Sequence, residues 1–152
     1  LMRVYSDTVN MVNAPFLAKE RGLDVREVRH DREGDYSTLL RVTVTTADGT
    51  RSAAGTIFGK GEPRLVEIHG IKVEADLTGD MLFVVNVDAP GFIGRLGSSL
   101  GQAGVNIGTF HLGRREAGGE AVLLLSVDSP VPEPVLWSVC QLEGVRKVKA
   151  LR

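Results

Sequence analysis

Two polar residues, Asp88 and Asn106, flank a glycine-dotted segment whose chemistry suits a small zwitterion. Asp88 follows an apolar run and precedes Ala89-Pro90-Gly91, and Asn106 stands just before a second apolar run. A carboxylate can hold an ammonium group, and an asparagine offers both a donor and an acceptor. The free N–H groups at a helix start attract anions. An α-amino acid would use this mixture, provided that Asp88 and Asn106 meet across a boundary between two copies.

The same residues can also be explained by helix capping and turn formation, and from their chemistry alone this explanation is at least as strong as a ligand site. An aspartate before a helix stabilises it by about 0.5 to 1 kcal/mol through capping and the helix dipole. Asparagine and glycine beside a helix end are common turn residues. The glycines at 94, 97, 101 and 104 match neither a dinucleotide-binding fingerprint nor a P-loop, so no nucleotide site is expected.

The elements around this segment predict a βαββαβ unit. Residues 81–87 read as an apolar strand, and residues 90–104 read as a helix with Pro90 at its first position. The expected apolar face of that helix carries Ile93, Leu96, Leu100 and Ala103. Strands are expected at 105–112, 120–128 and 144–151, with a helix running from the proline-rich loop at 129–134 to Leu142. This order predicts a ferredoxin-like sheet, with two helices on one face and the other face and edges free to pair.

The first half of the chain predicts a smaller α+β domain. Residues 13–22 read as a helix that Gly22 ends, and residues 39–47 alternate as a strand. Asp48-Gly49 and His69-Gly70 favour two tight hairpin turns. We place the boundary at residues 77–80, which gives domains of 1–78 and 79–152 and an α+β class overall.

Composition limits the classes of function. The 152 residues are 43% hydrophobic, and 18 basic residues face 19 acidic ones, so bulk charge implies neither a nucleic-acid nor a membrane partner. The single cysteine, Cys140, lies in an apolar run read as a buried helix face, which indicates a reducing, cytoplasmic compartment. His30, His69 and His111 lack metal-ligand spacing, and no nucleophile is arranged for catalysis. We therefore expect no metal site and no catalytic residue.

Two motifs resemble known regulatory domains. Residues 88–107, DAPGFIGRLGSSLGQAGVNI, resemble the ligand-binding motif of an ACT domain. The upstream segments VNAPFLAKERGLDV (12–25), DGT (48–50), GTIFG (55–59) and VEIHGIKVE (66–74) resemble the intervening domain of the long-form D-3-phosphoglycerate dehydrogenase family. Together they cover nearly the whole chain in that order.

The resemblance implies a regulatory fragment of a cytoplasmic, oligomeric enzyme of serine biosynthesis. Its catalytic domains, which bind NAD, would precede Leu1, so this fragment would need no cofactor of its own. L-serine would bind between two paired ACT domains as a feedback inhibitor, with Asn86 and Asp88 from one copy and Asn106 from the other. The effector set implied by the motif is Asn86, Asp88, Pro90, Gly91, Phe92, Asn106 and Ile107.

Asn86 departs from the family pattern, which commonly has histidine or tyrosine at that position, and this leaves the effector's identity open. The intervening domain of related enzymes can bind a phosphate-bearing anion, for which Lys60, Arg64 and Lys72 are the candidates here. Two alternatives remain. The fragment can be a constitutive oligomerisation module with a decayed ligand site, or a small ferredoxin-like enzyme such as an acylphosphatase, although residues 88–94 lack the arginine that such an enzyme needs.

Overall fold

The computed structural model describes residues 9–28, 36, 38–59 and 61–152. The chain separates into two compact units, residues 1–34 and 35–152. The first contains helix α1 (Ala14–Glu20), and Gly22 follows it with a φ of 70°. A left-handed glycine just beyond a helix is a common C-terminal stop, as predicted for residues 13–22. Among the described residues, no helix is both long and apolar enough to cross a membrane.

The second unit begins with a four-stranded antiparallel sheet, here called the first sheet. Its strands follow one another in sequence order: β1 (Leu40–Thr46), β2 (Gly49–Phe58), β3 (Glu62–Ile68) and β4 (Ile71–Asp76). His69 and Gly70 both have positive φ, at 52° and 76°, which is the backbone of a type I′ turn. The hairpin predicted there is confirmed.

The first hairpin loop lies one residue earlier than predicted. Thr46 pairs with Gly49, so the two loop residues are Ala47 and Asp48. The prediction of a turn at Asp48-Gly49 assumed that both residues adopt positive φ, but of these only Gly49 does, at 118°. Gly49 therefore opens β2 and lies beyond the loop.

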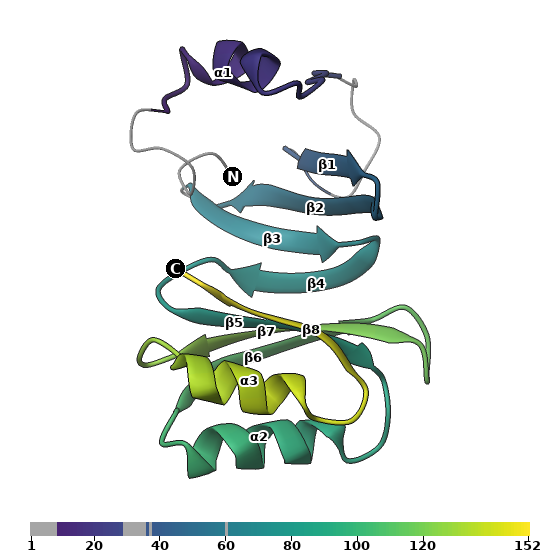
Figure 1. The fold of residues 1–152 in the computed structure, drawn as a ribbon, viewed down its shortest axis with the longest axis vertical. Coiled ribbons are helices and arrows are strands. Elements are labelled where there is room, and N and C mark those ends of the chain that lie inside the picture. The colour runs from purple at the N-terminus through teal and green to yellow at the C-terminus, as the bar shows by residue number, and fades with distance from the viewer. Residues whose placement is uncertain (1–8, 29–35, 37, 60) are drawn as a thin grey trace. The chain divides into compact units, whose positions relative to one another are not determined.

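The second sheet and its two helices follow the order βαββαβ. The elements are β5 (Met81–Val87), α2 (Phe92–Gln102), β6 (Ile107–Arg114), β7 (Glu120–Val127), α3 (Glu133–Cys140) and β8 (Val145–Leu151). The strand order is β6-β7-β5-β8, all antiparallel between neighbours. Figure 1 shows α2 and α3 on one side of this sheet. The predicted fold class, two α+β parts of which the second is ferredoxin-like, is confirmed.

The second sheet is buried on both faces. Leu82, Val84, Leu123 and Leu125 pack beneath α2 and α3. On the opposite face, the core cluster joins strand residues of the second sheet to residues of β3 and β4. Its members are Ile68, Ile71, Val73, Ala75, Met81, Val85, Val122 and Leu124. The prediction that this face is free to pair with another copy is therefore wrong. The signal was present in the continuous apolar run of β5, which is typical of a strand buried on both faces.

Helix α2 begins later than predicted, at Phe92 and not at Pro90. The Phe92 N–H donates to the Ala89 carbonyl at 3.2 Å, and Gly91 has φ 79° and ψ −8°. Proline followed by a left-handed glycine forms a type II turn, which places Pro90 outside the helix.

Three side chains also differ from the predicted burial. Ile93 is 52% exposed and Ala103 is exposed, because the later helix start brings Phe92 into the core with Leu96 and Leu100. Cys140 is exposed at the end of α3, where Val139 takes the buried position. The buried helix face predicted for Cys140 is wrong, and its exposure removes that argument about compartment.

Candidate functional site

Asp88 follows the end of β5, and its side chain is held by the end of β6 and by the connection between β6 and β7. Its Oδ2 accepts a hydrogen bond from Arg114 Nη1 at 2.7 Å and a longer one from the Gly118 N–H at 3.4 Å. The Arg114 guanidinium, with help from the Gly118 N–H, holds the pKa of Asp88 below its ordinary value. Both of these bonds reach Oδ2, which leaves Oδ1 available to accept from a ligand ammonium.

Asn106 stands exposed before β6 and contacts β7. Its Nδ2 donates to Asp128 Oδ2 at 2.7 Å, and the Asp128 N–H donates back to the Asn106 carbonyl at 3.3 Å. The side-chain oxygen of Asn106 accepts no hydrogen bond from the residues that the structure describes. Ile107, the next residue, is half-buried and packs against the core beneath the helices. Asn106 is thus oriented by Asp128 and keeps one acceptor open.

Within one chain, Asp88 and Asn106 lie at opposite ends of the second sheet. Strands β5 and β6 are both antiparallel to β7, so they run parallel to each other. Asp88 follows the end of β5, and Asn106 precedes the start of β6. The structure therefore brings these two residues together with different partners, Arg114 and Asp128, and not with each other.

The turn between Asp88 and α2 is exposed to solvent, whereas the first residue of α2, Phe92, is buried. Pro90 and Gly91 are exposed, and no side chain caps the helix start. A Cβ at Gly91 would lie 3.1 Å from Arg95 Nη1, so a cation stands beside the helix start. Phe92 is 2% exposed and packs in the core, where it fixes the helix and is out of reach of a ligand.

Asn86 is buried, with 2% of its surface exposed. Its Nδ2 donates to the Val87 carbonyl at 2.7 Å, while its Oδ1 is buried without a hydrogen-bond partner among the described residues. An unpaired buried amide oxygen costs about 1 to 3 kcal/mol. Asn86 is thus closed off from solvent, whereas the Asp88 side chain is 23% exposed.

Of the cations expected to form an anion site in the first sheet, Arg64 already has a carboxylate and an aromatic ring as partners. Arg64 Nε lies 3.0 Å from Asp76 Oδ1, without hydrogen-bond geometry, and its guanidinium lies 5.4 Å from the centre of the Phe58 ring. Lys72 is exposed and pairs in register with Glu67. Lys60 lies outside the described residues.

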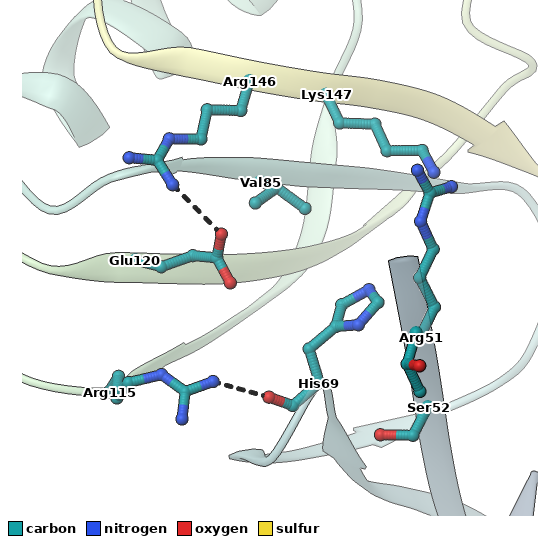
Figure 2. Close-up of a pocket in the computed structure, with 9 residues that line it drawn as sticks. Arg51, Ser52, His69, Val85, Arg115, Glu120, Arg146 and Lys147 are labelled. Carbon is teal, nitrogen blue, oxygen red and sulfur yellow. Dashed lines mark hydrogen bonds and ion pairs between the residues drawn. The ribbon is translucent and has the colours of Figure 1, made fainter. Parts of the chain in front are cut away.

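A different basic cluster, which sequence reasoning missed, lines a pocket of about 460 Å³. Figure 2 shows the side chains of this basic pocket. Its charged members are Arg51, Arg115, Glu120, Arg146 and Lys147, with His69 beside them. These residues come from β2, the His69-Gly70 turn, the β6–β7 connection, β7 and β8, so no local motif could reveal them. Among the described residues, histidine, cysteine and acidic side chains form no group suited to a metal ion.

The comparisons with known proteins agree with the motifs. Residues 1–69 match the D-3-phosphoglycerate dehydrogenase intervening domain. The chain is 36% identical over 146 residues to the D-3-phosphoglycerate dehydrogenase of Synechocystis, which covers 96% of this chain and 26% of that protein. It is 34% identical over 144 residues to the enzyme of the same name from Bacillus subtilis, covering 95% of this chain and 27% of that protein. The resemblance to D-3-phosphoglycerate dehydrogenase is confirmed.

The same pattern extends to an archaeal relative. The D-3-phosphoglycerate dehydrogenase of Methanocaldococcus jannaschii is 33% identical over 143 residues, covering 94% of this chain and 27% of that protein. The chain thus spans about a quarter of the length of these phosphoglycerate dehydrogenases.

Proposed function

We propose that the chain is the allosteric regulatory part of a D-3-phosphoglycerate dehydrogenase that binds an amino acid, L-serine, between the second sheets of two copies. The intact enzyme would use NAD bound by other domains and would act as a homo-oligomer in the cytoplasm. The similarity to phosphoglycerate dehydrogenases over nearly the whole chain supports this assignment.

The geometry that carries the proposal is the placement of Asp88 and Asn106 at opposite ends of one sheet. Strand β6 has only one neighbour, β7, among the described residues and is therefore an edge strand. If two copies paired along β6 about a two-fold axis, the two strands would run antiparallel. The Asp88 end of one copy would then lie beside Asn106 of the other, and each pairing would create two equal sites.

The surface of this edge is suited to such pairing. Phe110 and Leu112 are 37% and 38% exposed, and their register partners Leu125 and Leu123 belong to the core beneath the helices. Both side chains therefore stand on the helix side of the edge, where a second copy would bury them. An exposed edge strand with apolar side chains is otherwise a site for uncontrolled association.

The open acceptors match an amino acid's ammonium group. Asp88 Oδ1 from one copy and the Asn106 side-chain oxygen from the other would accept from it, while the helix α2 start would take the carboxylate. Binding that favours one arrangement of the two copies by about 1 to 3 kcal/mol would be enough to regulate attached domains.

One observation favours the constitutive oligomerisation module. Asp88 and Asn106 are each hydrogen-bonded within their own chain, to Arg114 and Asp128, so the fold does not depend on a ligand at either residue. Asn86 is also a buried amide at a position where the family that the motif resembles commonly has the larger histidine or tyrosine. Under this alternative, pairing along β6 would persist with no amino acid bound.

Calorimetry with L-serine, combined with sedimentation analysis of the chain, distinguishes these functions. Binding heat that is lost in Asn106→Ala and kept in the control Gln141→Ala, an exposed residue after α3, would support the regulatory site. A stable dimer without heat from any common amino acid would support the constitutive module. A monomer that binds no amino acid would contradict both.

A further inference from the structure

Arg114 reaches across a strand to hold Asp88. It is the last residue of β6 and pairs in register with Ala121 of β7, which in turn pairs with Asn86 of β5. Asp88 lies two residues beyond Asn86, so the Arg114 guanidinium crosses β7 to donate from Nη1 to Asp88 Oδ2 at 2.7 Å. The small side chain of Ala121 leaves room for this crossing. Arg114 thus stands beside Asp88, although the ligand-binding motif at residues 88–107 ends before it.

The guanidinium of Arg114 keeps most of its donors open. Nη1 donates to Asp88, whereas Nε and Nη2 have no acceptor among the described residues. The Arg114 side chain is 53% exposed, so water and small solutes reach it. Asp88 Oδ1 is the open atom of the other partner. The ion pair therefore presents an unused guanidinium edge next to an unused carboxylate oxygen, with no net charge.

Arg114 also lies where the second copy is expected. Side chains alternate along a strand, so Arg114 stands on the helix side of β6 with Phe110 and Leu112. Antiparallel pairing of this edge strand with its copy would bring Arg114 of one chain to the Asn106 end of the other. Asp88 follows β5, which lies two strands inside the edge. Arg114 therefore stands between Asp88 and the β6 edge.

Two other arginines near the ends of α2 and β6 face elsewhere. Arg115 turns to the first sheet, where its Nη2 donates to the His69 carbonyl at 2.8 Å. Arg95 lines a groove that α2 forms with α3. Helix α3 packs on β8, which is the edge opposite β6. Of the three arginines, Arg114 is the one that the fold directs to Asp88 and the β6 edge.

We propose that Arg114 determines the specificity of the effector site by binding the carboxylate of the amino acid, while Asp88 binds its ammonium group. This inference rests on the proposed function, because it needs the ligand at the β6 edge. A guanidinium matches a carboxylate through two parallel N–H bonds, for which Nε and Nη2 are available. The second carboxylate lone pairs can also accept from the α2 start. The site would select free α-amino acids, which carry both charges, over amines and amides.

The test compares L-serine with L-serinamide, in which an uncharged amide replaces the carboxylate. Calorimetry of the chain at about pH 6 keeps both ammonium groups charged. We expect serine to bind at least about tenfold more tightly, the value of a charge-assisted hydrogen bond. In Arg114→Gln the serine affinity should fall about tenfold and the serinamide affinity should not fall. The control Arg152→Gln breaks an arginine–aspartate pair at the opposite edge of the same sheet and should change neither affinity.

The ratio of the two affinities separates ligand binding by Arg114 from a purely positioning role. If Arg114 only held Asp88 in place, Arg114→Gln would weaken both ligands equally, and an unchanged ratio would overturn the inference while leaving the effector site intact. A native chain that binds neither ligand would instead contradict the proposed function itself. Nitrogen-15 NMR of the native chain needs no variant: the Arg114 Nε–H signal should shift with serine and not with serinamide. An equal shift with both ligands would also overturn the inference.

Discussion

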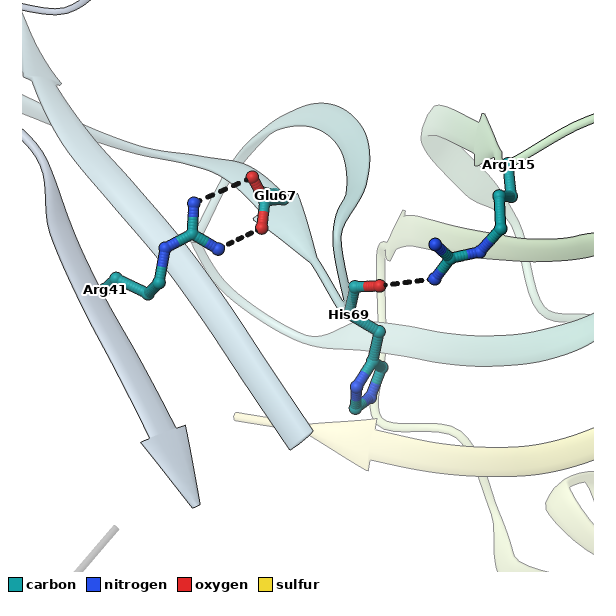
Figure 3. Close-up of polar contacts among 4 residues, drawn as sticks. All are labelled: Arg41, Glu67, His69 and Arg115. Atoms are coloured by element: carbon teal, nitrogen blue, oxygen red, sulfur yellow. Dashed lines mark hydrogen bonds and ion pairs between the residues drawn. The ribbon is translucent and has the colours of Figure 1, made fainter. Parts of the chain in front are cut away.

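Arg41 and Glu67 form a two-pronged ion pair although their strands, β1 and β3, are not neighbours. Arg41 and Glu67 both pair in register with Ala54 of β2, which lies between them. Arg41 Nη2 donates to Glu67 Oε2 at 2.9 Å, and Nη1 contacts Oε1, as Figure 3 shows. The small side chain of Ala54 lets the guanidinium cross over β2. Every residue of β1 is exposed, so little apolar burial holds this strand in place. The ion pair therefore links β1 to β3 and helps to keep it in the sheet.

Removing this pair should loosen β1. We expect Glu67→Gln to lower the free energy of unfolding by about 0.5 to 1 kcal/mol, the upper range for a partly exposed pair with good geometry. Arg26→Gln, which breaks the exposed pair with Asp24, is the control and should change stability far less. Urea denaturation at neutral pH measures both. An equal effect of the two variants would contradict the special role of the crossing geometry.

The same pair should make stability depend on acid pH. The Arg41 hydrogen bond holds the pKa of Glu67 below its ordinary value. A lowered folded-state pKa gives stability that is fully present above the unfolded value of about 4.3 and is lost as the pH falls through the folded value. The difference between the native chain and Glu67→Gln should therefore shrink below about pH 4.3. A difference that stays constant from neutral to acid pH would count against this linkage.

Gly113 should be intolerant of any side chain. It lies in β6 where the backbone of β4 approaches, and a Cβ there would collide with the Lys72 carbonyl oxygen and lie 2.9 Å from Ile71 Cγ2. We expect Gly113→Ala to cost about 1 to 3 kcal/mol through overpacking. Gly97→Ala, in α2 with nothing within 4 Å of its Cβ, should instead stabilise by about 0.5 to 1 kcal/mol. Thermal unfolding of the two variants should show shifts of opposite sign.

Lys147 should titrate at a lower pH than an ordinary lysine. Burial is the main cause, and Arg51 adds to it. Arg51→Gln removes a like charge, which favours the charged amine, so the pKa of Lys147 should rise in this variant. Carbon-13 NMR of the labelled lysine side chain measures both values. A Lys147 resonance that titrates unchanged in Arg51→Gln would show that the two groups do not interact.

The sequence predicted the elements well where hydrophobic period and turn residues act locally. The His69-Gly70 turn is an example, because only residues tolerant of positive φ suit that loop. The start of α2 was misplaced because Pro90 suits both a first helical position and a type II turn, and only Gly91 beyond it decides between them. The exposure of Ile93 follows from that shift.

The candidate site was predicted only as far as the individual residues. Asp88 and Asn106 were identified, but their partners Arg114 and Asp128 are distant in sequence and depend on the register of β5, β6 and β7. The basic pocket was missed because its residues come from two sheets, and no spacing rule connects Arg51 to Lys147. The apolar run of β5 indicates that both faces of the second sheet are covered, but which residues of the two sheets meet is decided by the whole chain and leaves no local pattern.

The approach of β4 to β6 at Gly113 has a consequence for communication within the molecule. Strand β6 is the edge at which we place the second copy, and its inner residue Gly113 lies directly against the backbone of Lys72. A shift of β6 on effector binding would therefore press on the first sheet through main-chain atoms, which cannot rotate away as side chains do. The strand proposed to pair with a second copy, β6, is thus the same strand that contacts the first sheet at Gly113.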